Sequence, residues 1–282
     1  MLFMIAVGAT FLIAGSIALF QAVYLGAIAF CLWSGLDALN NVFDADLDVI
    51  SDPSRAEYSQ KLGKIGLVIA IFFTVLASGL GIVTMIPLVV LFIMIGVFFG
   101  ILYSVPPFRL RQTVYKPLVN FTVAAVPILI VAGFYNSFSV SVAILVLFMG
   151  ITTSVNSLWE DLSDYASDLT NGARTVPIIL GLRRGLLFTI MMGYCLIPLM
   201  ILVGILFQMN LIYYVILSAL TTFISLRLVQ NRAIFYRSKD IEAKRLLKLG
   251  DVLAKDFVIC AIIQTLNMML SSYLKLGHLL PF

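Results

Sequence analysis

The chain has 282 residues, of which 62% are hydrophobic and only 11% charged, with a formal net charge of +4. Its mean hydropathy is +1.10, a value that excludes an ordinary soluble domain. A membrane-spanning helix needs about 20 apolar residues, so the length allows at most about ten spans, and one membrane domain over residues 1–282 is the simplest organisation.

Nine continuous apolar runs predict nine transmembrane helices. In chain order they cover residues 2–20, 22–43, 65–85, 87–106, 117–135, 139–159, 182–206, 210–227 and 256–274. Strands of a membrane barrel would need only about 10 residues of alternating polarity, so helices are favoured. The three cysteines lie inside these runs and are interpreted as small packing residues. The sequence therefore predicts an all-α, multi-pass integral membrane protein.

The basic residues predict the topology. All but one of the 18 Lys and Arg residues follow the second, fourth, sixth or eighth predicted helix; the exception is Lys275. The positive-inside rule then places these four connections in the cytoplasm, in a cell membrane. Acidic residues share that side, so a nucleic-acid-binding surface is not indicated and no nucleic acid is expected as a partner. The charged run 232–248 is interpreted as an ordinary cytoplasmic rim or an interfacial helix.

Polar residues repeat every four positions at the end of two predicted helices. The second helix carries Asn40, Asp44 and Asp48, and the sixth carries a second series. That second series consists of Asn156, Glu160, Asp164 and Asp168. A four-residue step overshoots one helical turn by only about 40°, so each series predicts one polar stripe.

Either stripe alone is consistent with an inert charged rim, but the pair predicts a cation site. Facing carboxylates repel each other and lose hydration at the membrane boundary, so cations between them are favourable. Oxygen ligands without nearby His or Cys favour Mg²⁺ as the cofactor.

Basic residues near the stripes can supply the other half of a phosphate site. They are Arg55, Arg109, Arg111 and Arg174. A bidentate arginine suits phosphate better than a point-charge lysine does. Membrane topology alone is an equally good reason for any one of these arginines.

These segments resemble the UbiA superfamily of intramembrane prenyltransferases. Asn40-x-x-x-Asp44-x-x-x-Asp48 and the following Asp52-Pro53-Ser54-Arg55 resemble its first aspartate motif and the arginine-bearing loop. The second motif and its Gly-x-x-Thr-x-Pro tail are similar to Asp161-x-x-Asp164-x-x-x-Asp168-x-x-x-Gly172-x-x-Thr175-x-Pro177. Between them, Tyr103-Ser104-x-Pro106-Pro107-x-Arg109-x-Arg111 resembles the segment after the fourth helix. The resemblance covers the first seven predicted helices in order, and the last two match only as hydrophobic spans.

The resemblance implies transfer of a prenyl group from its diphosphate to a lipophilic acceptor, in a central cavity capped by cytoplasmic loops. It implies catalytic roles for Asn40, Asp44, Asp48, Asp164 and Asp168, with the four aspartates holding Mg²⁺. The implied diphosphate-binding residues are Arg55, Tyr103, Ser104, Arg109, Arg111, Lys116 and Arg174. The lipid bilayer, a prenyl diphosphate and the acceptor are the expected partners.

Two departures from the family pattern concern the diphosphate site. Many members have Tyr-x-x-x-Lys after the fourth helix, whereas Tyr103 is followed four residues later by Pro107. Arg109, Arg111 or Lys116 is then expected to replace that lysine. Members also commonly carry an arginine in a polar segment before the first helix, and this sequence begins almost directly in an apolar run.

An allylic cation needs a dry cavity with aromatic faces. Phe43, Tyr103 and Tyr165 are the candidate walls, although interfacial tyrosines are also typical belt residues. Asp37, deeper in its helix than Asp44, is a candidate for positioning the acceptor or acting as a base; hydrogen bonding within the bundle is the alternative. Further candidate acceptor or cation contacts are Asn41 and Asp161.

Other readings of the sequence remain open for the acceptor and for the class of protein. An aromatic acceptor is favoured, with a glycerol-phosphate ether or a carotenoid as the alternative. A cation-coupled transporter would also explain intramembrane carboxylates, but its polar residues would continue through the membrane. A purely structural membrane protein would leave the two matching stripes without a cause.

Overall fold

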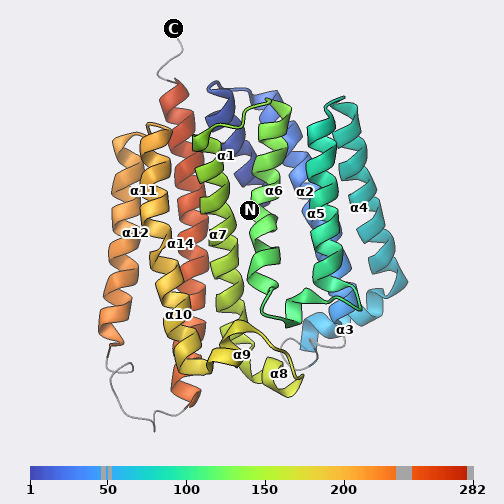
Figure 1. Ribbon diagram of the computed structural model, residues 1–282, viewed down its shortest axis with the longest axis vertical. Coiled ribbons are helices and arrows are strands. Elements are labelled where there is room, and N and C mark those ends of the chain that lie inside the picture. Colours follow the sequence, from blue (N-terminus) through green and yellow to red (C-terminus); the bar gives the residue numbers. More distant parts are fainter. Residues whose placement is uncertain (46–48, 50–52, 233–242, 278–282) are drawn as a thin grey trace.

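The structure is a computed structural model that describes residues 1–45, 49, 53–232 and 243–277, and over these residues it is helical with no strand (Figure 1). The first half contains α1 (Leu2–Ala14), α2 (Leu19–Asp44), α3 (Pro53–Leu62), α4 (Lys64–Val83), α5 (Pro87–Ser104), the 3-10 turn η1 (Leu110–Gln112) and α6 (Lys116–Phe134). The second half contains α7 (Val140–Ser163), α8 (Tyr165–Thr170), α9 (Val176–Leu180), α10 (Leu182–Tyr194), α11 (Leu196–Leu206), α12 (Leu211–Gln230) and α14 (Ala243–Gly277).

Seven segments within the described residues are long and apolar enough to cross a membrane, with α10 and α11 counted together as one. A bilayer offers the backbone no hydrogen-bond partners, so a helix, which satisfies its own N–H and C=O groups, is the form these runs must take. The apolar α1 has 13 residues and is shorter than these seven. The 35-residue α14 runs along the bundle and contains the last predicted run.

The boundary between the first two predicted helices was wrong. The apolar run 2–20 does not form one helix, because α1 ends at Ala14 and Gly15 adopts φ 62°, a left-handed conformation that ends helices. The Gly15 N–H donates to the Phe11 carbonyl, and α2 then begins at Leu19. Hydropathy stays high across this turn, so composition alone could not reveal it.

The predicted run 182–206 is confirmed as one segment long and apolar enough to cross a membrane, but its helix is interrupted at a single residue. Cys195 separates α10 from α11, although its own backbone stays in the right-handed helical region, at φ −63° and ψ −15°. Pro198 has no N–H to donate to the Tyr194 carbonyl four residues earlier, and its ring crowds that carbonyl. The proline therefore accounts for the break.

The second polar stripe does not lie on one continuous helix. The helix α7 ends at Ser163, Asp164 caps it, and the short α8 carries Asp168. The Asp168 N–H still donates to the Asp164 carbonyl, at 2.8 Å, so the two residues stay one turn apart. The stripe is thus bent rather than dispersed.

The helices form an upright bundle with the short elements gathered at one end (Figure 1). At that end lie α3, α8 and α9, which follow the second and sixth predicted helices. The helix α2 packs extensively on α4 and α1, and α6 packs on α5 and α7. Gly96 of α5 allows the close approach of α2, because a Cβ there would lie 2.9 Å from Leu32 Cδ2. This packing leaves a cavity between the helices near the capped end.

Candidate active site

A cavity of about 500 Å³ lies between α2, α5, α6 and the ends of α1 and α7. Its polar lining is formed by Asp37, Asn40, Tyr103, Ser104, Arg111, Lys116, Asn120, Thr122, Glu160 and Asp164. Its other lining residues are Leu2, Ala29, Leu32, Trp33, Leu36, Gly96, Gly100, Val119, Val123, Val126 and Pro127. All of these residues come from the first 164 positions of the chain.

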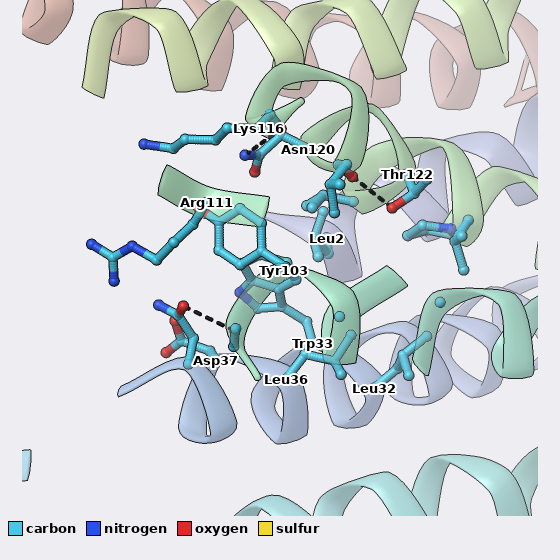
Figure 2. A pocket seen from close by; sticks show the side chains of 18 of the residues that line it. Leu2, Leu32, Trp33, Leu36, Asp37, Tyr103, Arg111, Lys116, Asn120 and Thr122 are labelled. Atoms are coloured by element: carbon cyan, nitrogen blue, oxygen red, sulfur yellow. Dashed lines mark hydrogen bonds between the residues drawn. The ribbon is translucent and has the colours of Figure 1, made fainter. Parts of the chain in front are cut away.

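The cavity is polar toward the capped end and apolar in its interior. In Figure 2 the charged ends of Arg111 and Lys116 reach to the same side, with Asp37 nearby, while Leu2 and Leu32 lie away from them. Tyr103 stands between these two regions, close to Trp33. A molecule with an anionic head and a hydrocarbon tail matches this division.

The first aspartate stripe is joined to the loop after α5. The Asp44 side chain has no exposed surface and forms an ion pair with Arg111 Nη1. Nearby, Arg109 Nη2 donates to the carbonyl of Phe43. Two arginines of one loop therefore hold the end of α2, one through a side chain and one through the backbone.

A second buried ion pair lies on the opposite wall. Lys116, at the start of α6, has Nζ 2.5 Å from Asp161 Oδ1 and 3.8 Å from Glu160 Oε2. The Asp161 side chain has no exposed surface, and its Oδ2 has no hydrogen-bond partner among the described residues. Lys116 thus bears the positive charge that compensates a buried carboxylate, while its side chain also lines the cavity.

Neutral polar groups connect the two helices that carry Asp37 and Tyr103. Ser104 Oγ donates to Asn40 Oδ1 at 3.0 Å and so ties α5 to α2 at the polar end. Asp37 accepts a long hydrogen bond of 3.4 Å from Asn41 Nδ2, one turn further along α2. The Asp37 carboxylate is exposed and lines the cavity.

Asp168 is partly buried in α8, outside the membrane-spanning segments. Burial raises the pKa of its carboxyl, and the neighbouring Asp164 carboxylate raises it further. The Lys116 and Arg111 cations and a hydrogen bond from Thr175 Oγ1, at 3.2 Å, act in the opposite direction. The carboxylates therefore gain from any additional cation nearby.

The donor chemistry of this end fits Mg²⁺. Oxygen ligands with waters and phosphate oxygens are what Mg²⁺ takes, usually through one or two carboxylates. Within the described residues no three His, Cys, Asp or Glu side chains are gathered tightly enough to enclose a metal. The repulsion between Asp164 and Asp168 that raises the Asp168 pKa is nevertheless the kind that a divalent cation relieves.

The structure distributes the sequence-predicted site residues over three positions. Those that line the cavity are Asp37, Asn40, Tyr103, Ser104, Arg111, Lys116 and Asp164. The buried Asp44 and Asp161 are paired with cations that line the cavity. Asp168 is close enough to these cations for their charge to lower its pKa. Residues outside the cavity lining are Asn41, Phe43, Arg109, Tyr165 and Arg174, of which Arg174 is exposed. Asp48 and the side chain of Arg55 lie outside the described residues.

Sequence reasoning missed two of the cavity residues that could contact a substrate. Trp33 is one helical turn before Asp37, so the spacing could have placed it on the same face of α2. Asn120 is one turn after Lys116 and donates to the Lys116 carbonyl at 3.2 Å. An asparagine inside an apolar run was the available signal for it.

The sequence was compared with family models and with solved structures. Residues 1–247 match the model described as the UbiA prenyltransferase family. A solved digeranylgeranylglyceryl phosphate synthase is 18% identical, covers 96% of this chain and 92% of its own, and has a TM-score of 0.67. A UbiA homologue from Archaeoglobus fulgidus bound to DMAPP and Mg²⁺ is 17% identical over 92% of this chain and 93% of its own, with a TM-score of 0.60.

An apo UbiA homologue from Aeropyrum pernix K1 is also similar, with 16% identity over 93% of this chain and 96% of its own and a TM-score of 0.61. The sequence matches none of the curated proteins with which it was compared. At these identities the solved structures establish a common fold.

Proposed function

Because the chain belongs to the UbiA prenyltransferase family of membrane enzymes, we propose that it transfers a prenyl group from an allylic prenyl diphosphate to a lipophilic, aromatic acceptor. Diphosphate is the leaving group, and Mg²⁺ is the cofactor. The observation that carries this proposal is the cavity with a charged end and an apolar interior.

The charged end would bind the diphosphate. Arg111 and Lys116 line it with positive charge, and Lys116 takes the place of the lysine that the family motif would have four residues after Tyr103. Bound Mg²⁺ would supply charge stabilisation to the departing diphosphate oxygens. Asp44, Asp48, Asp164 and Asp168 are the proposed metal ligands, and Asn40 orients the polar end of α2 through Ser104.

The remaining site residues have subsidiary roles in this proposal. Arg55 and Arg174 belong to the loops that would close over the diphosphate, whereas Arg109 holds the end of α2 through the Phe43 carbonyl. Asn41, Phe43, Asp161 and Tyr165 support the residues that line the cavity: Asn41 through Asp37, Phe43 through Arg109 and Asp161 through Lys116. For Tyr165 the structure offers position alone, at the start of α8.

The apolar interior would hold the prenyl chain and exclude water from the allylic cation. The exposed ring of Trp33 and the ring of Tyr103 offer aromatic faces within the cavity, which stabilise a cation. Asp37, which lines the cavity one turn after Trp33 on α2, would accept a proton from the acceptor.

The membrane arrangement that accompanies this function has nine spans, with α1 and α14 added to the seven long apolar segments. The capped end with α3, α8 and α9 would face the cytoplasm of the cell, as the distribution of basic residues indicates. Prenyl diphosphates, which are charged, would then enter from the cytoplasmic side.

A glycerol-phosphate ether is the second candidate acceptor. It is favoured by the similarity in fold to the digeranylgeranylglyceryl phosphate synthase, at a TM-score of 0.67. Exposed Trp33 in the cavity favours the aromatic acceptor instead.

The direct test incubates detergent-purified protein with Mg²⁺ and labelled geranyl or geranylgeranyl diphosphate. Phenolic acceptors and a geranylgeranylglyceryl phosphate are supplied in parallel, and the products are identified by mass. Asp164→Asn should abolish product, whereas Asp251→Asn, an exposed aspartate of α14, should not. Product formation that survives a metal chelator would contradict Mg²⁺ dependence, and the absence of any prenylated product would contradict the proposed transfer.

A further inference from the structure

In this structure the buried carboxylate of Asp44 is paired with an arginine. Its side chain has no exposed surface, and Arg111 of η1 provides the ion pair that compensates its charge. The Arg111 side chain is 18% exposed and lines the cavity. The guanidinium thus lies between a buried carboxylate and the space where a substrate would bind.

A divalent cation and the guanidinium compete for the same carboxylate. Bringing a cation to Asp44 while Arg111 stays there would place two positive groups together in a poorly solvated site, where repulsion is strong. An arginine remains protonated, so it cannot avoid the conflict by losing a proton. Release of Arg111 from Asp44 would therefore favour metal binding there, and an anion in the cavity would then pair with the guanidinium.

The cavity offers a place for that anion. Lys116, on the other wall of the cavity, has Asp161 as its partner at 2.5 Å, so part of its charge is already compensated. Arg111 is therefore the cavity cation that would gain most from a new anionic partner. A diphosphate at the charged end would add acceptor oxygens next to Arg111, in the bidentate arrangement that guanidinium favours.

We propose that Arg111 is an exchangeable counterion, which pairs with Asp44 before metal and diphosphate bind and transfers to the diphosphate when they do. The inference rests on the proposed function and adds a coupling to it. Each of the two ligands removes an obstacle to the other: the diphosphate takes up Arg111, and the metal takes up Asp44. Binding of either one should therefore strengthen binding of the other by the same factor.

Arg109 provides a matched control two residues earlier in the same loop. Its Nη2 donates to the Phe43 carbonyl, and its side chain does not line the cavity. Replacing either arginine by glutamine removes one positive charge from the loop, but Arg111→Gln also removes the ion pair between Arg111 and Asp44. A general electrostatic effect would appear in both variants.

The experiment measures Mn²⁺ binding by electron paramagnetic resonance, with and without methylenediphosphonate, in the full-length detergent-purified protein. Wild type should bind Mn²⁺ weakly alone and roughly tenfold more tightly with methylenediphosphonate, within the usual range for coupled sites. Arg111→Gln should bind Mn²⁺ alone more tightly than wild type and lose most of this coupling. Arg109→Gln should keep it, which also corrects for complexes of Mn²⁺ and methylenediphosphonate in solution, since these are the same for all proteins.

Arg111→Lys is a second, more conservative variant, which keeps the test possible if Arg111→Gln fails to fold. It keeps the charge without the bidentate geometry, and should show coupling between that of wild type and that of Arg111→Gln. If Mn²⁺ binds to wild type but binding alone and coupling are unchanged in both Arg111 variants, the counterion exchange is refuted while the proposed function survives. If wild type binds no Mn²⁺ under either condition, the proposed metal dependence itself fails.

Discussion

The buried pair of Lys116 and Asp161 allows a stability effect to be separated from a functional one. Lys116→Met would leave Asp161, whose side chain has no exposed surface, without its partner at 2.5 Å. Removing one member of a buried ion pair costs about 3–5 kcal/mol. For a chain of this length that corresponds to a fall of roughly 6–20 °C in the apparent melting temperature.

The reverse substitution should cost less. Asp161→Asn leaves Lys116 with Glu160 Oε2 still 3.8 Å away, so the lysine keeps a compensating negative charge. The expected cost is that of a hydrogen bond to a charged group, about 1.5–3 kcal/mol. The double variant, with Lys116→Met and Asp161→Asn, removes both charges and should recover most of the stability that Lys116→Met loses.

The affinity for diphosphate should not recover together with the stability. The double variant would fold without the cation that lines the charged end, so its affinity for methylenediphosphonate in the presence of Mg²⁺ should remain far below that of wild type. Melting is followed by intrinsic fluorescence in detergent, and binding by calorimetry. A double variant as unstable as Lys116→Met alone, or one that binds methylenediphosphonate like wild type, would refute the reasoning.

The remaining predictions address protonation, chain length and topology. Thr175→Val removes the hydrogen bond that lowers the Asp168 pKa, so this carboxyl should become protonated at a higher pH. Because Mg²⁺-dependent binding of methylenediphosphonate needs the ionised carboxylate, binding should be lost at a higher pH in the variant than in wild type when the solution is acidified. The same pH of binding loss in both proteins would contradict this. Gly96→Ala places a Cβ 2.9 Å from Leu32 Cδ2 and pushes that side chain into the cavity, so product from geranylgeranyl diphosphate should fall more than product from geranyl diphosphate. Gly79→Ala, which meets open space, is the control, and equal losses for both diphosphates would argue against a chain in this interior. Single cysteines at Ser238 and Gly277, in a variant without native cysteines, should be labelled from opposite sides of the membrane, and labelling from the same side would exclude nine spans.

The helical architecture could be predicted because lipid leaves an apolar run one way to satisfy its backbone. The positions of helix breaks were harder to predict, since they depend on single residues. Pro198 gives a direct signal for the break between α10 and α11, but Gly15 signals the end of α1 only through its left-handed backbone. Long apolar segments were therefore predicted better than their limits.

The spacing of polar residues predicted much of the charged end of the cavity, but it could not predict which of these residues form ion pairs with one another. Asp44 and Arg111 pair across α2 and η1, and Lys116 pairs with Asp161 across α6 and α7. Such pairs depend on how helices dock, for which one sequence carries no distance information. The same limitation explains why Phe43 was expected at the cavity, whereas Trp33 lines it instead.

The cavity is built by the N-terminal part of the chain, with lining residues from α1, α2, α5, α6 and the end of α7. The helices from α10 onward contribute no side chain to this lining among the residues that the structure describes. Exchange of residues 182–277 for the equivalent helices of a homologue should therefore change lipid contacts and bundle stability while leaving the choice of diphosphate substrate with the recipient. The chain would then offer two separable regions for engineering, one for the choice of substrate and one for contacts with the membrane.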